Sequence, residues 1–358
     1  MGEKENLAPS AVGSVAVQKP PHFVLVHGIS GGGWCWYKIR CLMENSGFKV
    51  TCIDLKGAGI DLSDPNSVVK FDDYNKPLLD FVSSLPENEQ IILVGHSAGG
   101  LSVTQATLKF AKKIRLAVYV AATMLRFGFQ TDQDIKNVNK FFFSLLLIHI
   151  NSSLICDYWH PLTLTHNSLS NDSIMLNNSG SKIYFSVWNI FRGFVRKKVK
   201  IRLRPVGVLK VRKGVPDLSE FGDAYDVGFG QGPQQPPTTA VVKRELQRKI
   251  IYHMSPHEDS TLASMLLRPG PILALRTARF REENGELDRV KRVYIRTTYD
   301  RVIKPEQQEA MIREWLPEIV YEMDTDHSPF FSNPSLLFGL LVKAAAAAAA
   351  ASSTAACN

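Results

Sequence analysis

Six short apolar runs recur along the chain, each bounded by glycine, proline or polar residues. They read HFVLVHG, KVTCIDL, IILVG, IRLAVYVAA, RVYIRTT and EIVYEM, at residues 22–28, 49–55, 91–95, 114–122, 292–298 and 318–323. Segments with apolar residues at helical spacing lie between them, such as FDDYNKPLLDFVSSL. Apolar strands that alternate with amphipathic helices are typical of a parallel sheet with helices on both faces. The pattern predicts an α/β fold with a mostly parallel sheet flanked by helices.

The alternation is interrupted after the fourth run and resumes near residue 290. The intervening chain contains helical pieces around RELQRKIIYHM and STLASMLL and a stretch rich in proline and glycine, GFGQGPQQPPTT. We interpret this region, about residues 124–275, as a lid inserted over the carboxyl edge of the sheet. The expected organisation is a flexible tail at 1–20, a domain at 21–343 that contains the lid, and an alanine-rich tail at 344–358.

One part of the predicted lid, residues 137–213, fits neither a strand nor a helix pattern. It is rich in Phe, Leu, Asn and Ser, becomes abruptly basic, and has a net charge of +10, which leaves −2 for the rest of a chain whose total is +8. The segment is either a basic patch for an acidic partner or an insertion of translated non-coding sequence, such as a retained intron. We favour the insertion, and we expect no nucleic-acid partner.

Other features limit the compartment and the cofactors. The N-terminus lacks the apolar stretch of a secretory signal, and the apolar run FFFSLLLIHI is too short to cross a bilayer. The five cysteines show neither a CxxC pair nor a ligand-like spacing with histidine. The sequence therefore predicts a cytoplasmic protein without a membrane partner, disulfide framework, metal or cofactor. For the oligomeric state, a homodimer is compatible with the sequence.

The stretch LVGHSAGGLS contains a G-x-S-x-G motif around Ser97. The motif follows a predicted strand and opens a predicted helix, which is the context of a nucleophile elbow. Gly95 and Gly99 let strand and helix approach closely, so the serine hydroxyl is presented above the sheet edge at a helix N-terminus. Ser97 is therefore the candidate nucleophile.

A serine nucleophile needs a base, and the base needs an orienting acid, in the chain order Ser, Asp, His for this fold. Asp300 follows the strand RVYIRTT, and His327 follows the strand EIVYEM. Both positions are at the carboxyl edge of the predicted sheet, where Ser97 also lies. Asp300 and His327 are therefore the candidate acid and base.

Five other residues are weaker candidates for these two roles. Two carboxylates are too close to His327 in sequence to reach its Nδ1 comfortably, and the three histidines lie in the irregular middle region or inside the elbow; they are Asp324, Asp326, His253, His257 and His96.

An oxyanion hole needs two backbone donors. One candidate is the amide of Ala98, directly after the nucleophile, and the other is the amide of Ile29, in the loop VHGISGGGW after the first strand. The glycines of that loop could also indicate a dinucleotide site, but Ser30 breaks the G-x-G-x-x-G spacing that starts at Gly28. We favour the oxyanion hole.

The motifs HFVLVHGISGGGWCWYKI, VTCIDLKGAGID, ILVGHSAGG, KRVYIRTTYDRVIKPEQQ and DTDHSPFFSNP resemble the plant methylesterase family of the α/β-hydrolases, which includes hydroxynitrile lyases. The resemblance covers residues 22–136 and 214–343, and members run directly between those two parts. It implies an α/β-hydrolase fold with Ser97 as nucleophile, His327 as base, Asp300 as its partner, and Ile29 and Ala98 as oxyanion donors. Within the family, the chain is most similar to esterases of methyl indole-3-acetate.

Two positions depart from the pattern of the lyases. Lyases carry threonine where this chain has Gly28 and lysine where it has Ser328, so the resemblance favours an esterase. Many methylesterases carry methionine at the second position, so Ser328 is expected to alter the acyl pocket. The expected substrate is the methyl ester of a small aromatic or cyclic acid: methyl indole-3-acetate first, then methyl salicylate or methyl jasmonate. The alternatives are a non-catalytic hormone-binding protein on the same fold and, less favoured, a hydroxynitrile lyase.

Overall fold

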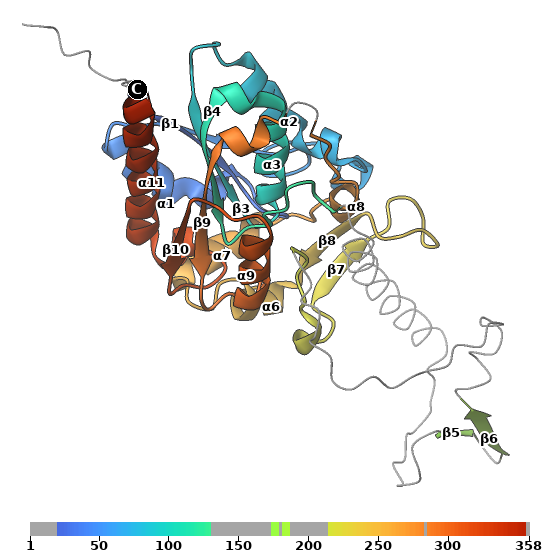
Figure 1. Ribbon diagram of the computed structural model, residues 1–358. Helices are drawn as coiled ribbons and strands as arrows, with labels where there is room; N and C mark the ends of the chain where they lie inside the picture. The colour runs from blue at the N-terminus through green and yellow to red at the C-terminus, as the bar shows by residue number, and fades with distance from the viewer. Residues whose placement is uncertain (1–19, 130–172, 179–180, 187–213, 283–284, 356–358) are drawn as a thin grey trace, which may run out of the picture.

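A six-stranded sheet forms the centre of the computed structural model, which describes residues 20–129, 173–178, 181–186, 214–282 and 285–355 (Figure 1). The strand order is β10-β9-β4-β3-β1-β2, and every neighbouring pair is parallel. The strands are β1 (His22–Val26), β2 (Lys49–Ile53), β3 (Ile91–His96), β4 (Ile114–Val120), β9 (Lys291–Thr297) and β10 (Ile319–Met323). The predicted fold class is confirmed, and the six predicted strands all form.

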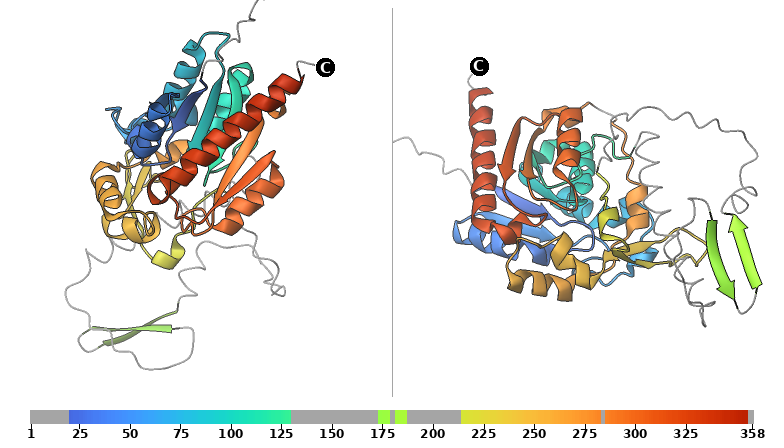
Figure 2. Two further views of the ribbon diagram at one scale, coloured as in Figure 1. Left: turned by 90° about the vertical axis from the view of Figure 1, so that its left-hand side faces the viewer. Right: turned by 90° about the horizontal axis from the view of Figure 1, so that it is seen from below.

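Successive residues of the strands face opposite sides of the sheet, which builds two cores. Phe23 and Leu25 pack with α1 (Tyr37–Asn45), α10 (Pro329–Ser332) and α11 (Pro334–Ala355). Val24 and Val26 pack with α2 (Phe71–Ser84), α3 (Gly99–Phe110) and α9 (Pro305–Glu314). Figure 2 shows α11 lying along one face of the sheet. Because both faces are covered, the strands are apolar throughout, as the sequence pattern predicted.

The last helix continues into the alanine run. α11 extends from Pro334 to Ala355, so the expected tail boundary at residue 343 falls inside it. The side chains of Ala344, Ala345 and Ala348 are buried in the same core as Leu337. Alanine has the highest helix propensity, and here its small side chain also lets the helix pack closely on the sheet side of the molecule.

The segment 214–282, between β4 and β9, covers the carboxyl edge of the sheet. Its elements are the antiparallel strands β7 (Tyr225–Gly228) and β8 (Thr239–Val242), followed by α6 (Arg244–Ile250), α7 (His257–Leu266) and α8 (Ile272–Arg276). This lid is joined to the body where Thr123 Oγ1 donates to the Gly214 carbonyl at 3.1 Å and Phe129 N donates to the Ala278 carbonyl at 2.9 Å.

Two predicted segments fall largely outside the described residues. The expected insertion, 137–213, is described only at the antiparallel pair β5 (Ser173–Asn178) and β6 (Ser181–Ser186). The expected tail at 1–20 is described only at its last residue. Within the described ranges, no helix combines the length and the apolar character that a bilayer span requires.

Candidate active site

Ser97 occupies the tight turn between β3 and α3. Its backbone φ is +54°, in the left-handed region that non-glycine residues rarely adopt. Such a conformation costs about 1–3 kcal/mol, so the surroundings must hold it. Its carbonyl accepts hydrogen bonds from the amides of Gly100 and Thr123 at 3.0 and 2.9 Å, and its amide donates to the Val120 carbonyl at 3.3 Å. The turn is therefore fixed by both the helix and the neighbouring strand.

Glycines make this turn sterically feasible. A Cβ built on Gly95 would lie 2.6 Å from a methyl group of Val103 in α3. A Cβ on Gly99 would lie 2.5 Å from the His27 carbonyl oxygen in the loop after β1. Neither position has room for a larger residue, so the motif G-x-S-x-G serves here to bring strand, helix and loop together.

The structure brings the candidate nucleophile, base and acid into one hydrogen-bonded chain. His327 Nε2 lies 3.0 Å from Ser97 Oγ, and His327 Nδ1 lies 2.8 Å from Asp300 Oδ2. The three residues are 6%, 4% and 3% exposed, so the interactions are shielded from water. A carboxylate can only accept, so Nδ1 carries the ring proton and donates a hydrogen bond to Asp300. This tautomer leaves Nε2 free to accept a hydrogen bond from the serine hydroxyl.

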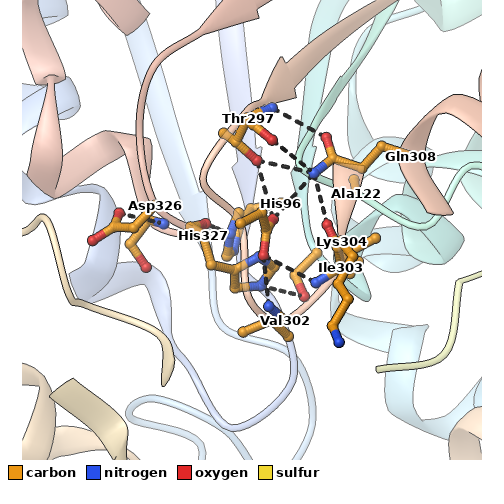
Figure 3. A network of polar contacts seen from close by, with 12 residues as sticks. His96, Ala122, Thr297, Val302, Ile303, Lys304, Gln308, Asp326 and His327 are labelled. Atoms are coloured by element: carbon orange, nitrogen blue, oxygen red, sulfur yellow. Dashed lines mark hydrogen bonds and ion pairs between the residues drawn. The ribbon is translucent and has the colours of Figure 1, made fainter. Parts of the chain in front are cut away.

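The carboxylate of Asp300 is oriented by four further donors. Its Oδ1 accepts from the amides of Val302 and Ile303 at 2.8 and 3.0 Å. Its Oδ2 accepts from Thr297 Oγ1 at 3.0 Å and Gln308 Nε2 at 3.3 Å, in addition to His327 (Figure 3). Gln308, on α9, is fully buried. Its Oε1 accepts from the Thr297 amide, and its Nε2 donates to the Thr297 carbonyl. This residue was not predicted from the sequence.

His96 holds the backbone of the candidate base, His327. Its Nε2 donates to the His327 carbonyl at 2.7 Å, and the two rings lie with their centroids 4.6 Å apart. Burial lowers the pKa of His96 well below its usual value, and the neighbouring His327 adds to that effect. His96 is therefore neutral, which suits its role as a hydrogen-bond donor to a carbonyl. Sequence reasoning set it aside as a base and did not predict this contact.

Among the described residues, no hydrogen bond or ion pair joins the other weaker candidates to the His327 ring. Asp324 is exposed and accepts from Thr298 Oγ1, while the buried Asp326 accepts from backbone and side-chain groups described below. His257 is an exposed residue at the start of α7, and His253 is half-buried in the lid.

Ile29 and Ala98 border the same cavity as Ser97. Within the described part of the chain, neither amide nitrogen has a hydrogen-bond acceptor. The Gly28 carbonyl accepts from His27 Nδ1 at 2.7 Å and from the Gly31 amide at 3.2 Å. Because the peptide is trans, holding this carbonyl on one side turns the Ile29 N–H to the other. Two N–H groups without an acceptor among the described residues therefore belong to residues that line the cavity next to Ser97.

His27 is the residue that fixes this loop. Its Nε2 accepts from the Leu55 amide at 3.1 Å, so its Nδ1 must be the protonated nitrogen that donates to Gly28. Burial lowers the pKa of His27, which keeps the ring in this neutral form. In the sequence, this role of His27 is indicated by the pair His27-Gly28 directly after the first strand.

A cavity of about 130 Å³ lies above Ser97 and His327, between the sheet edge and the lid. Its described wall contains no Lys, Arg, Asp or Glu. Aromatic and aliphatic side chains dominate it, with aromatic groups from the first loop, the lid and α10: Trp34, Phe129, Tyr225, Tyr252 and Phe330. Such a cavity is suited to an uncharged, largely apolar ligand. In the described ranges, no three His, Cys, Asp or Glu side chains are grouped as a metal site would require.

Comparisons with known proteins identify a matching family profile, relatives in sequence and similar solved structures. A family profile described as "alpha/beta hydrolase fold" matches residues 21–160. Methylesterase 17 of Arabidopsis thaliana is 48% identical over 91% of this chain and 92% of its own length, and pheophorbidase of Raphanus sativus is 36% identical over 90% and 93%. The crystal structure of methylesterase MES16 from Arabidopsis is similar with a TM-score of 0.62 and 32% identity, over 91% of this chain and 99% of that one.

Proposed function

Because the chain belongs to the plant methylesterase family of the α/β-hydrolase superfamily, we propose that it hydrolyses small methyl esters with Ser97, His327 and Asp300 as its catalytic triad. The observation that carries the proposal is the continuous chain of hydrogen bonds from Ser97 Oγ through His327 to Asp300, at 3.0 and 2.8 Å, at the floor of an uncharged cavity.

The proposed reaction follows from the hydrogen bonds. His327 Nε2 accepts the proton of Ser97 as Oγ attacks the ester carbonyl carbon. The carbonyl oxygen becomes negatively charged and is received by the N–H groups of Ile29 and Ala98. Asp300 stabilises the imidazolium that forms, and its backbone donors keep the carboxylate in place.

The second half of the reaction reuses the same groups. His327 returns its proton to the methoxy oxygen, so the carbon–oxygen bond breaks and methanol leaves an acyl-enzyme on Ser97. Water then loses a proton to His327 and attacks the acyl carbon. His327 returns that proton to Ser97 Oγ as the bond between the acyl carbon and Oγ breaks, and the free acid departs. Every proton is transferred through His327, so the proposed reaction requires no cofactor. As a separate point, we expect the protein to act in the cytoplasm.

The cavity wall supports a neutral aromatic substrate. The ester is uncharged, and its ring would lie against the aromatic side chains of the first loop and the lid. The acid product is an anion, and the described wall has no Lys or Arg to retain it. The same site therefore binds the ester better than the acid, which favours product release. We propose methyl indole-3-acetate as the preferred ester, with methyl salicylate and methyl jasmonate as the comparators.

The space at Gly28 favours hydrolysis over cyanohydrin cleavage. A Cβ at this position would lie 2.7 Å from Ser97 Cβ, so the threonine of the lyases would not fit without a backbone shift. Ser328, at the position of the lyase lysine, supplies no positive charge to hold cyanide. We expect no cleavage of mandelonitrile-type cyanohydrins above background. Enzyme-dependent cyanide release that Ser97→Ala abolishes would contradict this assignment.

A chromogenic acetate ester separates an esterase from a hormone-binding protein. The purified chain should hydrolyse the ester, and the Ser97→Ala variant should not. Binding of indole-3-acetate methyl ester without hydrolysis of either ester would instead support the non-catalytic alternative.

A further inference from the structure

Asp326 stands directly before the proposed base and is completely buried. Its Oδ2 accepts from the Met254 amide and from Ser255 Oγ, both at 2.9 Å. Its Oδ1 accepts from the Ser328 amide at 3.0 Å. Among the described residues it forms no ion pair, so these three donors are what offsets its burial.

The two oxygens of Asp326 bind different parts of the molecule. Met254 and Ser255 belong to the turn between α6 and α7 of the lid, whereas Ser328 is the first residue after His327. The same turn brings Tyr252 into the cavity wall, where its ring packs on Phe331 of α10 with a centroid separation of 5.9 Å. Asp326 therefore joins the lid to the segment that carries the base.

The peptide group between His327 and Ser328 is held at both ends. Its carbonyl accepts from His96 Nε2 at 2.7 Å, and its N–H donates to Asp326 Oδ1 at 3.0 Å. Figure 3 shows Asp326 and Gln308 on opposite sides of His327. The orientation of this peptide fixes the Cα of His327, and with it the 3.0 Å approach of Nε2 to Ser97 Oγ.

We propose that Asp326 is a positioning residue that makes the placement of His327 depend on a docked lid. When the 252–255 turn is in place, its two donors hold the carboxylate so that Oδ1 can hold the Ser328 amide. When the turn moves away, the carboxylate is released and the base loses one of its two backbone supports. Asp326 does not itself border the cavity, so its effect on kcat is exerted through the backbone of His327 and not through a contact of its own with the ester. This inference rests on the proposed role of His327.

Asp326→Asn is the direct test, because it replaces one acceptor oxygen with a donor. Three donors surround the side chain, so the amide must set its NH₂ against either Ser328 N–H or the lid pair. We expect kcat for a chromogenic acetate ester to fall about 10- to 100-fold, as a displacement of the base by roughly 1 Å can cause, with KM within about twofold. The melting temperature, measured in parallel, should stay well above the assay temperature.

Two further variants separate positioning from a merely structural role. Ser255→Ala removes one lid donor and should lower kcat about 3- to 10-fold; combined with Asp326→Asn it should add almost nothing, because Ser255 acts through the carboxylate. Asp324→Asn is the matched control: it is the same change on the same loop, at an exposed residue that accepts a hydrogen bond from Thr298 Oγ1. It should keep the wild-type kcat.

The rate of covalent labelling of Ser97 by a fluorophosphonate provides a second readout that needs no ester substrate. It should fall in parallel with kcat in Asp326→Asn. Three results would overturn the role of Asp326 but not the triad. They are an unchanged kcat in Asp326→Asn, an equal loss in Asp324→Asn, and additive effects in the double variant. A wild-type chain that neither reacts with the probe nor hydrolyses esters would overturn the proposed triad as well. If Asp326→Asn does not fold, Ser255→Ala decides: a lower kcat at constant KM supports the proposal, and an unchanged kcat contradicts it.

Discussion

Gly28 illustrates how little space the site leaves at the scale of single residues. Its α-carbon faces the proposed nucleophile, so a Cβ would lie 2.7 Å from Ser97 Cβ and 3.3 Å from Ser97 Oγ. Gly28→Ala must therefore displace the serine or the loop that carries Ile29. We expect kcat to fall by about 100-fold, since displacements of this size disturb the reacting geometry. Steady-state kinetics with a chromogenic ester measures the loss.

A second glycine provides the control for this change. Gly339 is an exposed residue of α11, and a Cβ there meets no atom within 4 Å. Gly339→Ala should keep full activity and stabilise the helix by up to about 1 kcal/mol. Equal activity of the two variants would show that the space at Gly28 does not matter for the reaction.

The sequence predicted the residues at the strand ends better than their partners. Ser97, Asp300 and His327 follow three strands of one parallel sheet, so topology alone places them at one edge. Gln308 and His96 could not be predicted, because each binds a backbone group that only the folded chain brings near: the Thr297 amide for one and the His327 carbonyl for the other. The contacts of Asp326 with the lid depend on tertiary structure in the same way.

At the scale of elements, the strands that are buried on both faces of the sheet were the ones that the sequence predicted. The six strands are continuous apolar runs because both faces of the sheet are covered, and all six were found within about two residues of their bounds. The helical pieces predicted in the lid correspond to α6 and α7. The hairpin β7–β8 was not predicted, because each strand has only four residues and mixed burial, and a stretch rich in proline and glycine separates them.

The alanine run of α11 gives a prediction at this scale. Ala344 is 1% exposed and packs in the core beneath the helix, whereas Ala347 is exposed. Ala344→Glu places a carboxylate where it has no partner and should lower the free energy of unfolding by about 2–4 kcal/mol. Ala347→Glu should change it by less than about 0.5 kcal/mol. Thermal unfolding compares the two, and equal melting temperatures would mean that the run does not pack on the body.

At the scale of the whole molecule, two buried neutral histidines make stability depend on pH. Burial lowers the pKa of both His27 and His96 in the folded state. The unfolded chain, with ordinary histidine pKa values near 6.5, then binds more protons than the folded chain at acidic pH. The free energy of unfolding should therefore fall as the pH drops below about 6.5, by up to about 1.4 kcal/mol per pH unit for each histidine.

His96→Gln isolates one of these contributions. The glutamine amide can still donate to the His327 carbonyl but does not titrate. Chemical denaturation between pH 5 and pH 7 should give a slope that is shallower than that of the wild type by about 1.4 kcal/mol per pH unit at most. An unchanged slope would mean that His96 is protonated equally in both states.

Deletion of residues 137–213 tests the organisation of the chain. The α/β-hydrolase fold continues from Gly214, whose carbonyl accepts a hydrogen bond from Thr123 Oγ1. Thr123 lies six residues before Phe129. Residues 130–136 can span up to about 25 Å, so joining Lys136 to Gly214 is geometrically feasible. We propose that the segment is an insertion, and that its removal raises the soluble yield and keeps or improves ester hydrolysis. Unfolding of the shortened chain, or loss of activity, would show that the segment is a structural element.

Hydrolysis of methyl indole-3-acetate by the purified chain is the most direct test of the proposed function. The wild type should release methanol and the free acid in equal amounts, and Ser97→Ala and His327→Ala should each lower kcat by about four orders of magnitude or more while remaining folded. Asp300→Asn should cost somewhat less. Retention of even a tenth of the wild-type activity in His327→Ala would contradict the proposed base and, with it, the hydrogen-bonded chain on which the proposal rests.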